Sequence, residues 1–156
     1  MGKSGFKKAL ASSSKIVSLT GFSGQRIAVE ASAIQHWLYH CDDFAHGFQM
    51  LAKNNYASAV ARFIHFAEQL RHLGIDLVFV FDGELHAGKK ATDESRAQEY
   101  EAARAELQPF FLAGRGADDD DVRRLIRRCS RRTPEFTFGI ISALRKKWVY
   151  LRRGPV

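Results

Sequence analysis

The feature that most constrains the fold is an unbroken apolar run near the middle of the chain. Residues 77–81 read Leu-Val-Phe-Val-Phe, and Asp82 and Gly83 follow directly. A short run of this composition predicts a strand that is buried on both faces. In an open parallel sheet, ligands bind beyond the carboxyl ends of the strands, so a functional carboxylate is expected at Asp82. The alternative is that Asp82 and Gly83 form only the turn that ends the strand.

A second strand is predicted at residues 26–30, Arg-Ile-Ala-Val-Glu, and it also ends in an acid. Between the two strands, apolar residues recur at helical spacing over residues 32–48 and again over residues 56–73. A strand, helices and a strand in this order imply a parallel pair and an α/β fold. Both strands then end at the same edge of the sheet, so Glu30 and Asp82 are expected to meet there.

Local signals mark the ends of the predicted helices. Ser32 is the expected N-cap of the first one, and residues 53–55, Lys-Asn-Asn, are expected to end it. Gly74 is expected at the C′ position of the second. Pro109 is expected to stop a later helix, and the pair Thr133-Pro134 is expected to open the last one as N-cap and first helical residue.

The residues that follow the second strand predict a long, polar helix over residues 89–108. A helix that is polar on all sides usually projects from the core. Lys89 and Arg96 are seven residues apart, so they share one face of this helix. They are either solubilising charges or functional groups placed close behind Asp82.

The net charge of +7 is concentrated in the last third of the chain. Residues 1–108 hold 12 basic and 12 acidic side chains, whereas residues 109–156 hold 12 basic and 5 acidic ones. Such a segment favours a polyanionic partner, either nucleic acid or an acidic membrane surface, or else it is a solvated arginine-rich helix. Residues 118–121, four aspartates, are expected to stabilise the start of this helix. Residues 148–151, Trp-Val-Tyr-Leu, predict a third strand.

Cysteine usage and the amino terminus bear on the cellular compartment. Cys41 and Cys129 are far apart in the sequence and predict buried, reduced thiols in an intracellular protein. No apolar run reaches membrane-spanning length. The first 26 residues hold five basic side chains and no acidic one, which resembles an organelle transit peptide.

A separate hypothesis is a metal-binding site formed by histidines. His36 and His40 are four residues apart and could hold zinc together with His46 or Cys41. Neither an HExxH motif nor a paired-cysteine spacing accompanies them, so core or surface histidines are the simpler interpretation.

Taken together, these residues resemble the N-terminal region of the XPG/flap-endonuclease superfamily of structure-specific 5′ nucleases, and within it the exonuclease 1 branch. The family's opening Met-Gly-x-x-Gly-[Leu/Phe] corresponds to residues 1–6, its [Val/Ile]-Asp-Ala-Ser to residues 29–32, and its Val-Phe-Asp-Gly to residues 80–83. Its Lys and Arg pair falls on Lys89 and Arg96. A start that matches the family motif also argues against a cleaved transit peptide.

The resemblance implies a fold and a set of roles. The fold would be a PIN-like, three-layer α/β/α arrangement with a mainly parallel sheet. Such nucleases hold two Mg²⁺ ions with a cluster of acids, so Asp82 and Glu30 would be metal ligands. Lys89 and Arg96 would be catalytic, stabilising charge on the scissile phosphate. The residues expected to contact DNA are Gly2, His36, Lys90, Arg123, Arg127 and Arg128.

The chain departs from the family pattern in two ways. Glu30 stands where the family has Asp, and its extra methylene moves the carboxylate by roughly 1.5 Å, which matters because Mg²⁺ demands near-ideal octahedral geometry. The sequence also ends before the family's internal Ala-Pro-Tyr-Glu-Ala-[Glu/Asp]-Ala motif, so the C-terminal half of the fold would be incomplete. Residues 1–108 would form the nuclease region with its arch-base helix. Residues 109–156 would continue the same domain into a truncated third strand.

These patterns support three hypotheses. The first is the N-terminal part of an exonuclease 1-like, Mg²⁺-dependent nuclease of the nucleus that acts on DNA 5′ ends, flaps or junctions in repair or replication. It would be inactive alone, because two carboxylates are too few for a two-metal site. The second is a non-catalytic nucleic-acid-binding protein that uses the basic residues 123–153. The third is an interaction protein with no nucleic-acid role. No membrane partner is expected under any of them.

Overall fold

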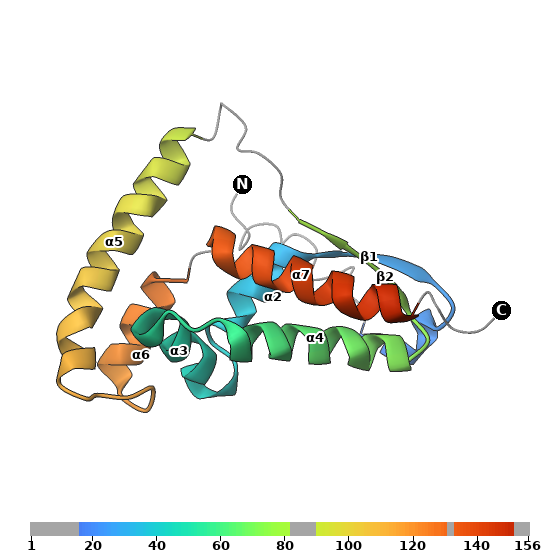
Figure 1. Cartoon of the computed structure of the whole chain (residues 1–156), viewed down its shortest axis with the longest axis horizontal. Coiled ribbons are helices and arrows are strands. Elements are labelled where there is room, and N and C mark those ends of the chain that lie inside the picture. Colours follow the sequence, from blue (N-terminus) through green and yellow to red (C-terminus); the bar gives the residue numbers. More distant parts are fainter. Residues whose placement is uncertain (1–15, 82–89, 131–132, 152–156) are drawn as a thin grey trace.

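The computed structural model of the chain describes residues 16–81, 90–130 and 133–151. These residues form a mixed α/β fold that is mostly helical and contains a small parallel sheet (Figure 1), which confirms the predicted fold class. In chain order the elements are η2 (Leu19–Phe22), β1 (Arg26–Glu30), α2 (Ala31–Leu38), η3 (Asp42–Phe44), α3 (Ala45–Lys53), α4 (Ala57–His72), β2 (Asp76–Val80), α5 (Lys90–Leu112), α6 (Asp120–Arg128) and α7 (Pro134–Leu151).

The two strands pair in parallel, as the sequence predicts. Arg26 lies beside Asp76 at one end of the pair, and Glu30 lies beside Val80 at the other. The Arg26 side chain donates a hydrogen bond from Nε to Oδ2 of Asp76 at 2.6 Å, across the amino end of the pair. The carboxyl ends of both strands therefore lie at the same edge of the sheet.

Only one face of β2 is covered by the described elements. Leu77 is 6% exposed, and the ring of Phe79 lies 5.1 Å from that of Phe63 on α4. On the opposite face Val78 and Val80 are 43% and 50% exposed. The prediction of a strand buried on both faces is therefore wrong for this part of the chain, because the described elements cover β2 with α4 on one side alone.

Helix α4 is the centre of the packing. It contacts α2, α3, α7 and β2, and in Figure 1 α7 runs alongside it while α5 and α6 stand together at the far end of the molecule. Tyr39, Phe63 and Phe136 are the largest side chains in the fully buried core. Cys41 and Cys129 are free and buried, as predicted. Burial raises the pKa of the Cys129 thiol to about 11, so this thiol stays protonated at neutral pH.

The stretch 32–48 does not form the single helix that its periodicity predicts. It is divided into α2 and α3 by a turn in which three successive residues other than glycine adopt a left-handed backbone. Their φ angles are 51° at Asp42, 52° at Asp43 and 65° at Phe44. The prediction fails because the apolar spacing continues across the break, so periodicity alone cannot reveal it.

Of the predicted helix-end signals, those at Gly74, at Thr133 and at residues 53–55, where α3 ends at Lys53, are confirmed. Those at Ser32 and Pro109 are wrong. Gly74, with a φ of 78°, ends α4 in the left-handed conformation. The hydroxyl of Thr133 accepts a hydrogen bond from the Phe136 amide at 3.2 Å and so caps α7. Ser32, in contrast, lies inside α2, whose N-cap is Glu30. The Ser32 hydroxyl donates to the Glu30 carboxylate instead.

Pro109 does not stop α5, which continues for one further turn to its end at Leu112. The Ala113 amide still donates to the Pro109 carbonyl at 3.0 Å. The added turn is held by aromatic packing, since the ring of Phe111 lies 5.2 Å from that of Phe48 in an edge-on arrangement. Near a helix end this packing offsets the one hydrogen bond that proline removes. The predicted division of the domain at residue 108 stays a prediction.

The third strand predicted at residues 148–151 is also wrong, because these residues form the end of α7. An existing helix gains a hydrogen bond for each residue that it orders, whereas a strand needs a neighbouring strand. An ion pair between Lys147 and Glu68 on α4 also ties this part of α7 to the core.

Candidate nucleic-acid interface and metal site

One predicted metal ligand lies at the carboxyl edge of the sheet. Glu30 is the last residue of β1 and is exposed, and the Ser32 hydroxyl donates to its Oε1. Its neighbour across the pair is Val80, and Asp82 follows two residues later in the sequence. Asp82, Lys89 and Gly2 lie outside the described residues, so their predicted roles stay predictions.

The polar helix predicted over residues 89–108 is present as α5, Lys90–Leu112. Lys90 is its first residue, and Arg96 is exposed in its N-terminal half. The buried residues Tyr100, Ala103 and Leu107 all lie further along, where α5 packs on α6. Figure 1 shows the N-terminal half extending away from the rest of the molecule, as expected for a helix so polar.

A second group of polar side chains lies on and after α2. His36 is exposed, and its ring lies 4.9 Å from that of His40, which in turn lies 5.6 Å from the ring of Phe44. His40 Nε2 is 3.1 Å from the Ser130 hydroxyl, and Nδ1 is buried with no described hydrogen-bond partner. Burial, helped by His36 and Arg127, lowers the pKa of His40, so the ring is neutral at pH 7.

Phe44 makes contacts that the sequence does not predict. Two arginines one turn apart on α6, Arg123 and Arg127, place their guanidinium groups over its ring, at 5.8 Å and 4.9 Å from the centroid. The Arg123 Nε also donates to the Ala117 carbonyl at 2.7 Å. No local signal marks Phe44, because its position depends on the left-handed turn described above.

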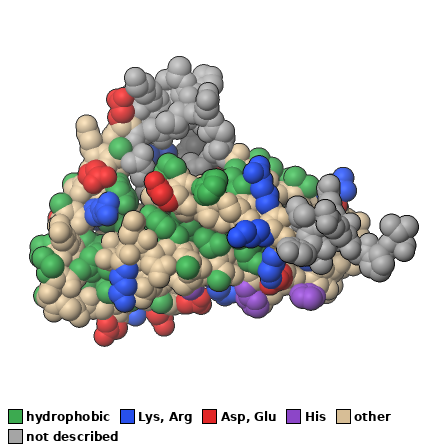
Figure 2. Space-filling model, in the orientation of Figure 1, with side chains coloured by type: hydrophobic (Ala, Val, Ile, Leu, Met, Phe, Trp, Pro, Cys, Tyr) green, Lys and Arg blue, Asp and Glu red, His purple; other side chains and the backbone are tan. Residues whose placement is uncertain are grey.

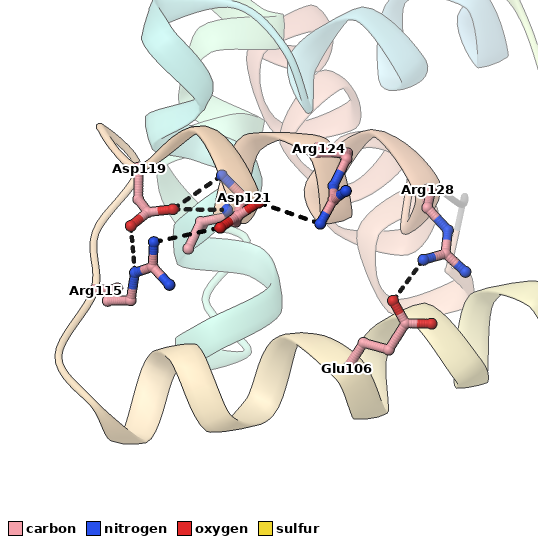
Figure 3. Close-up of polar contacts among 7 residues, drawn as sticks. Glu106, Arg115, Asp119, Asp121, Arg124 and Arg128 are labelled. Atoms are coloured by element: carbon pink, nitrogen blue, oxygen red, sulfur yellow. Dashed lines mark hydrogen bonds and ion pairs between the residues drawn. The ribbon is translucent and has the colours of Figure 1, made fainter.

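The remaining arginines of this region are paired with acids (Figure 3). Arg128 donates to Glu106 on α5 at 2.6 Å, and Arg124 donates to Asp121 at 3.2 Å. Asp119 is the N-cap of α6, since its carboxylate accepts from two backbone amides of the first turn. The predicted role of the aspartates at the helix start is therefore confirmed. Of the arginines predicted to contact DNA, Arg127 is exposed over an aromatic ring, whereas Arg128 is held by an acid.

The molecular surface has a mixed charge pattern. On the face shown in Figure 2, basic side chains stand among acidic and hydrophobic ones, and no continuous basic band crosses the described part of this face. On this face, contact with a polyanion would therefore be made by separate groups of basic residues.

The described residues include a metal ligand of the type that suits Mg²⁺, but too few such ligands for a Mg²⁺ site. The carboxylate of Glu30 is the type of hard oxygen donor that Mg²⁺ prefers. Within the described ranges no group of three potential ligands includes Glu30; the group that the structure brings together is Cys41, Asp42 and His46. The group therefore contains neither His36 nor His40, the two residues on which the zinc hypothesis is based.

The sheet edge with Glu30, the projecting helix α5 and the arginine-bearing α6 belong to one mixed α/β domain. A family model described as the XPG N-terminal domain matches residues 1–103 of the 156 in the chain. The chain therefore belongs to the XPG N-terminal domain family, whose nucleases generally depend on divalent metal ions and act on nucleic acids. No curated protein sequence matches the chain. Among the described helices, none is both long and apolar enough to cross a bilayer.

Proposed function

We propose that the chain is the N-terminal part of a Mg²⁺-dependent 5′ nuclease, nearest the exonuclease 1 branch, that acts on DNA ends, flaps or junctions during repair or replication in the nucleus. One observation carries the proposal. In a chain of this family, the parallel register of β1 and β2 aligns Glu30 with Val80, two residues before Asp82. This register supports the proposal that Glu30 and Asp82, the family's two strand-end acids, would meet at one edge of the sheet.

Glu30 and Asp82 are the residues that would hold Mg²⁺. When bound, the ion supplies an activated water and stabilises the leaving oxygen. The Ser32 hydroxyl, which donates to the Glu30 carboxylate, orients this ligand. Because two carboxylates do not complete a two-metal site, the 156 residues alone are inactive in cleavage.

Basic residues on two helices would bind the substrate. Arg96, on α5, and Lys89, which precedes that helix in the sequence, would stabilise the scissile phosphate, and Lys90 and Gly2 would contact the DNA. His36, exposed on α2, would contact the junction. On α6, Arg127 is expected to contribute more than Arg128, because Glu106 already neutralises Arg128.

A binding experiment tests this arrangement. The affinity of the chain is measured for a labelled 5′-flap DNA and for a blunt duplex of equal length, over a series of salt concentrations. We expect a preference for the flap, and a log affinity that falls linearly with log salt because phosphates are neutralised. Arg127→Ala should reduce that slope by about one, and Arg128→Ala by less. His36→Ala should remove the flap preference, while the exposed control His72→Ala should not. Equal affinity for both DNAs, or no salt dependence, contradicts the proposal.

A cleavage experiment tests the metal site. With Mg²⁺ or Mn²⁺ and the same flap, we expect no product from the 156 residues. Product that disappears with Asp82→Ala would refute the inactivity of these residues and support their catalytic role. Glu30→Asp, which restores the family residue, should make flap binding depend more strongly on Mg²⁺, and an unchanged dependence would argue against Glu30 as a ligand.

The second candidate is a non-catalytic nucleic-acid-binding protein. It is favoured by the exposed Arg127 over Phe44, because guanidinium and aromatic groups together suit nucleic acid. This candidate requires that binding persists unchanged, without any metal, in Glu30→Ala and Asp82→Ala. If both variants lose affinity, it is excluded.

A further inference from the structure

Side chains of three different metal-binding types converge where the chain turns from α2 into α3. The Cys41 sulfur, a carboxylate oxygen of Asp42 and a ring nitrogen of His46 all lie within 4.8 Å of one another. We propose that these three residues bind a Zn²⁺-type transition-metal ion, at a site separate from the Mg²⁺ site at the sheet edge.

The backbone of the turn is what brings the three side chains together. Asp42, Asp43 and Phe44 all have positive φ, a conformation that costs roughly 1–2 kcal/mol for each L-residue. The turn places Cys41 and Asp42 beside His46 in the first turn of α3. An ion bonded to residues on both sides of the reversal would help to offset this cost.

The ring of His46 is oriented as a metal ligand requires. Its Nδ1 lies 3.1 Å from the Ser58 hydroxyl on α4, and its Nε2 lies 3.1 Å from Asp42 Oδ2. When Ser58 accepts the Nδ1 hydrogen, the Nε2 lone pair faces the carboxylate, and a cation between the two removes their repulsion. Metal-bound histidines commonly donate their second ring nitrogen to such a partner. Ser58 is therefore a positioning residue.

The donor types select the ion. A thiolate, an imidazole and a carboxylate together suit Zn²⁺, whereas Mg²⁺ and Ca²⁺ take oxygen ligands alone. The side chains of His46 and Asp42 are 15% and 49% exposed, so an ion can enter from solvent while the buried Cys41 forms the inner wall. Three protein ligands leave the fourth tetrahedral position for water.

Arg62 on α4 is the competing occupant of the cluster. Its Nε lies 3.1 Å from the same oxygen, Oδ2, that His46 approaches. Asp42 can thus be held either by the guanidinium or by a metal ion. The alternative to a metal site is an ion-pair network of Asp42, His46 and Arg62 that joins the turn to α4.

The test is a titration of the 156-residue chain with Co²⁺, followed by absorption. We expect one equivalent to bind with visible ligand-field bands and a near-ultraviolet band from thiolate coordination, and Zn²⁺ to displace it. Cys41→Ser should abolish the near-ultraviolet band, and His46→Gln should weaken Zn²⁺ binding by about tenfold or more. Cys129→Ser, which removes the other buried thiol, should leave both the near-ultraviolet band and the affinity for Zn²⁺ unchanged.

Two further outcomes decide the matter. If Cys41→Ser does not fold, Ser58→Ala keeps all three ligands and should weaken Zn²⁺ binding by about tenfold through the lost orientation of His46. If the near-ultraviolet band is absent from the parent chain, or survives in Cys41→Ser, the site is only the ion-pair network and the proposal is overturned. The titration contains no nucleic acid, so its failure leaves the proposed nuclease function untouched.

Discussion

Replacing Gly47 by alanine should destabilise the protein, because a side chain at this residue of α3 has no room beside its neighbours. A Cβ at position 47 would lie 2.8 Å from Cγ2 of Ile126 on α6 and closer still to the backbone carbonyl of Tyr39. Ile126 is fully buried on α6, where a β-branched side chain has little freedom at χ1. The carbonyl oxygen belongs to the backbone and cannot move without shifting the chain. Overpacking of this kind costs about 1–3 kcal/mol, against a gain of about 1 kcal/mol when alanine replaces glycine in a helix.

The expected result of Gly47→Ala is a loss of about 1–2 kcal/mol in the free energy of unfolding, since the carbonyl contact places the steric cost in the upper part of its range. For a chain of this size that corresponds to a fall in Tm of about 2–8 °C. The measurement is urea unfolding followed by circular dichroism. Gly139→Ala is the matched control, because its Cβ would meet only a Val60 methyl at 3.2 Å, which can yield.

A second readout links this contact to function. Gly47→Ala should move α6, which carries Arg127, relative to α2, which carries His36, and so weaken flap binding as well as stability. The reasoning is refuted if Gly47→Ala unfolds at the same urea concentration as Gly139→Ala, or at a higher one. That result would mean that the Tyr39 backbone can shift at little cost in free energy, and that it does not fix the positions of α3 and α6.

The remaining predictions concern single polar groups. Thr137→Val should cost about 1–3 kcal/mol of stability, because the buried Gln35 amide donates to the Thr137 hydroxyl at 2.9 Å; Thr137→Ser keeps the hydroxyl and should lose less. Folding lowers the pKa of His40 below its ordinary value of 6.5. The stability that neutral His40 contributes above pH 6.5 is therefore lost as the pH falls through the pKa of the folded chain. His40→Gln should flatten this part of a plot of stability against pH. Asp119→Ala removes the N-cap of α6 and should lower both the helical signal and the unfolding midpoint, whereas Asp119→Asn should preserve them.

The features that the sequence predicts correctly depend on neighbouring residues. The strand at 26–30, the parallel pairing, and the helix ends at Gly74 and Thr133 follow from local composition and from the length of the crossover. The aspartates at residues 118–121 are expected at the start of a helix for the same local reason, although the sequence does not single out Asp119 as the N-cap.

The features that the sequence misses depend on distant contacts. The left-handed turn at Asp42–Phe44 contains no glycine, and it is held by α6 arginines over Phe44 and by Arg62 on Asp42, which lie far away in the chain. Likewise, α5 passes Pro109 because Phe111 packs on Phe48.

Only part of the candidate site could be predicted from the sequence. The position of Glu30 at the carboxyl edge follows from the parallel strands, but its role as a ligand stays a prediction, as do those of Asp82 and Lys89. The contact between Arg127 and the Phe44 ring could not be predicted, because it needs the turn that brings Phe44 to α6.

The small sheet has a consequence for handling the 156 residues in solution. Within the described residues β1 and β2 pair only with each other, so each leaves one row of backbone amides and carbonyls without a neighbouring strand. Beside that row, Val78 and Val80 present apolar side chains at 43% and 50% exposure. Open, apolar strand edges recruit further strands. We therefore expect the chain to self-associate through its sheet as concentration rises, and Val80→Lys to suppress this by adding charge at the edge.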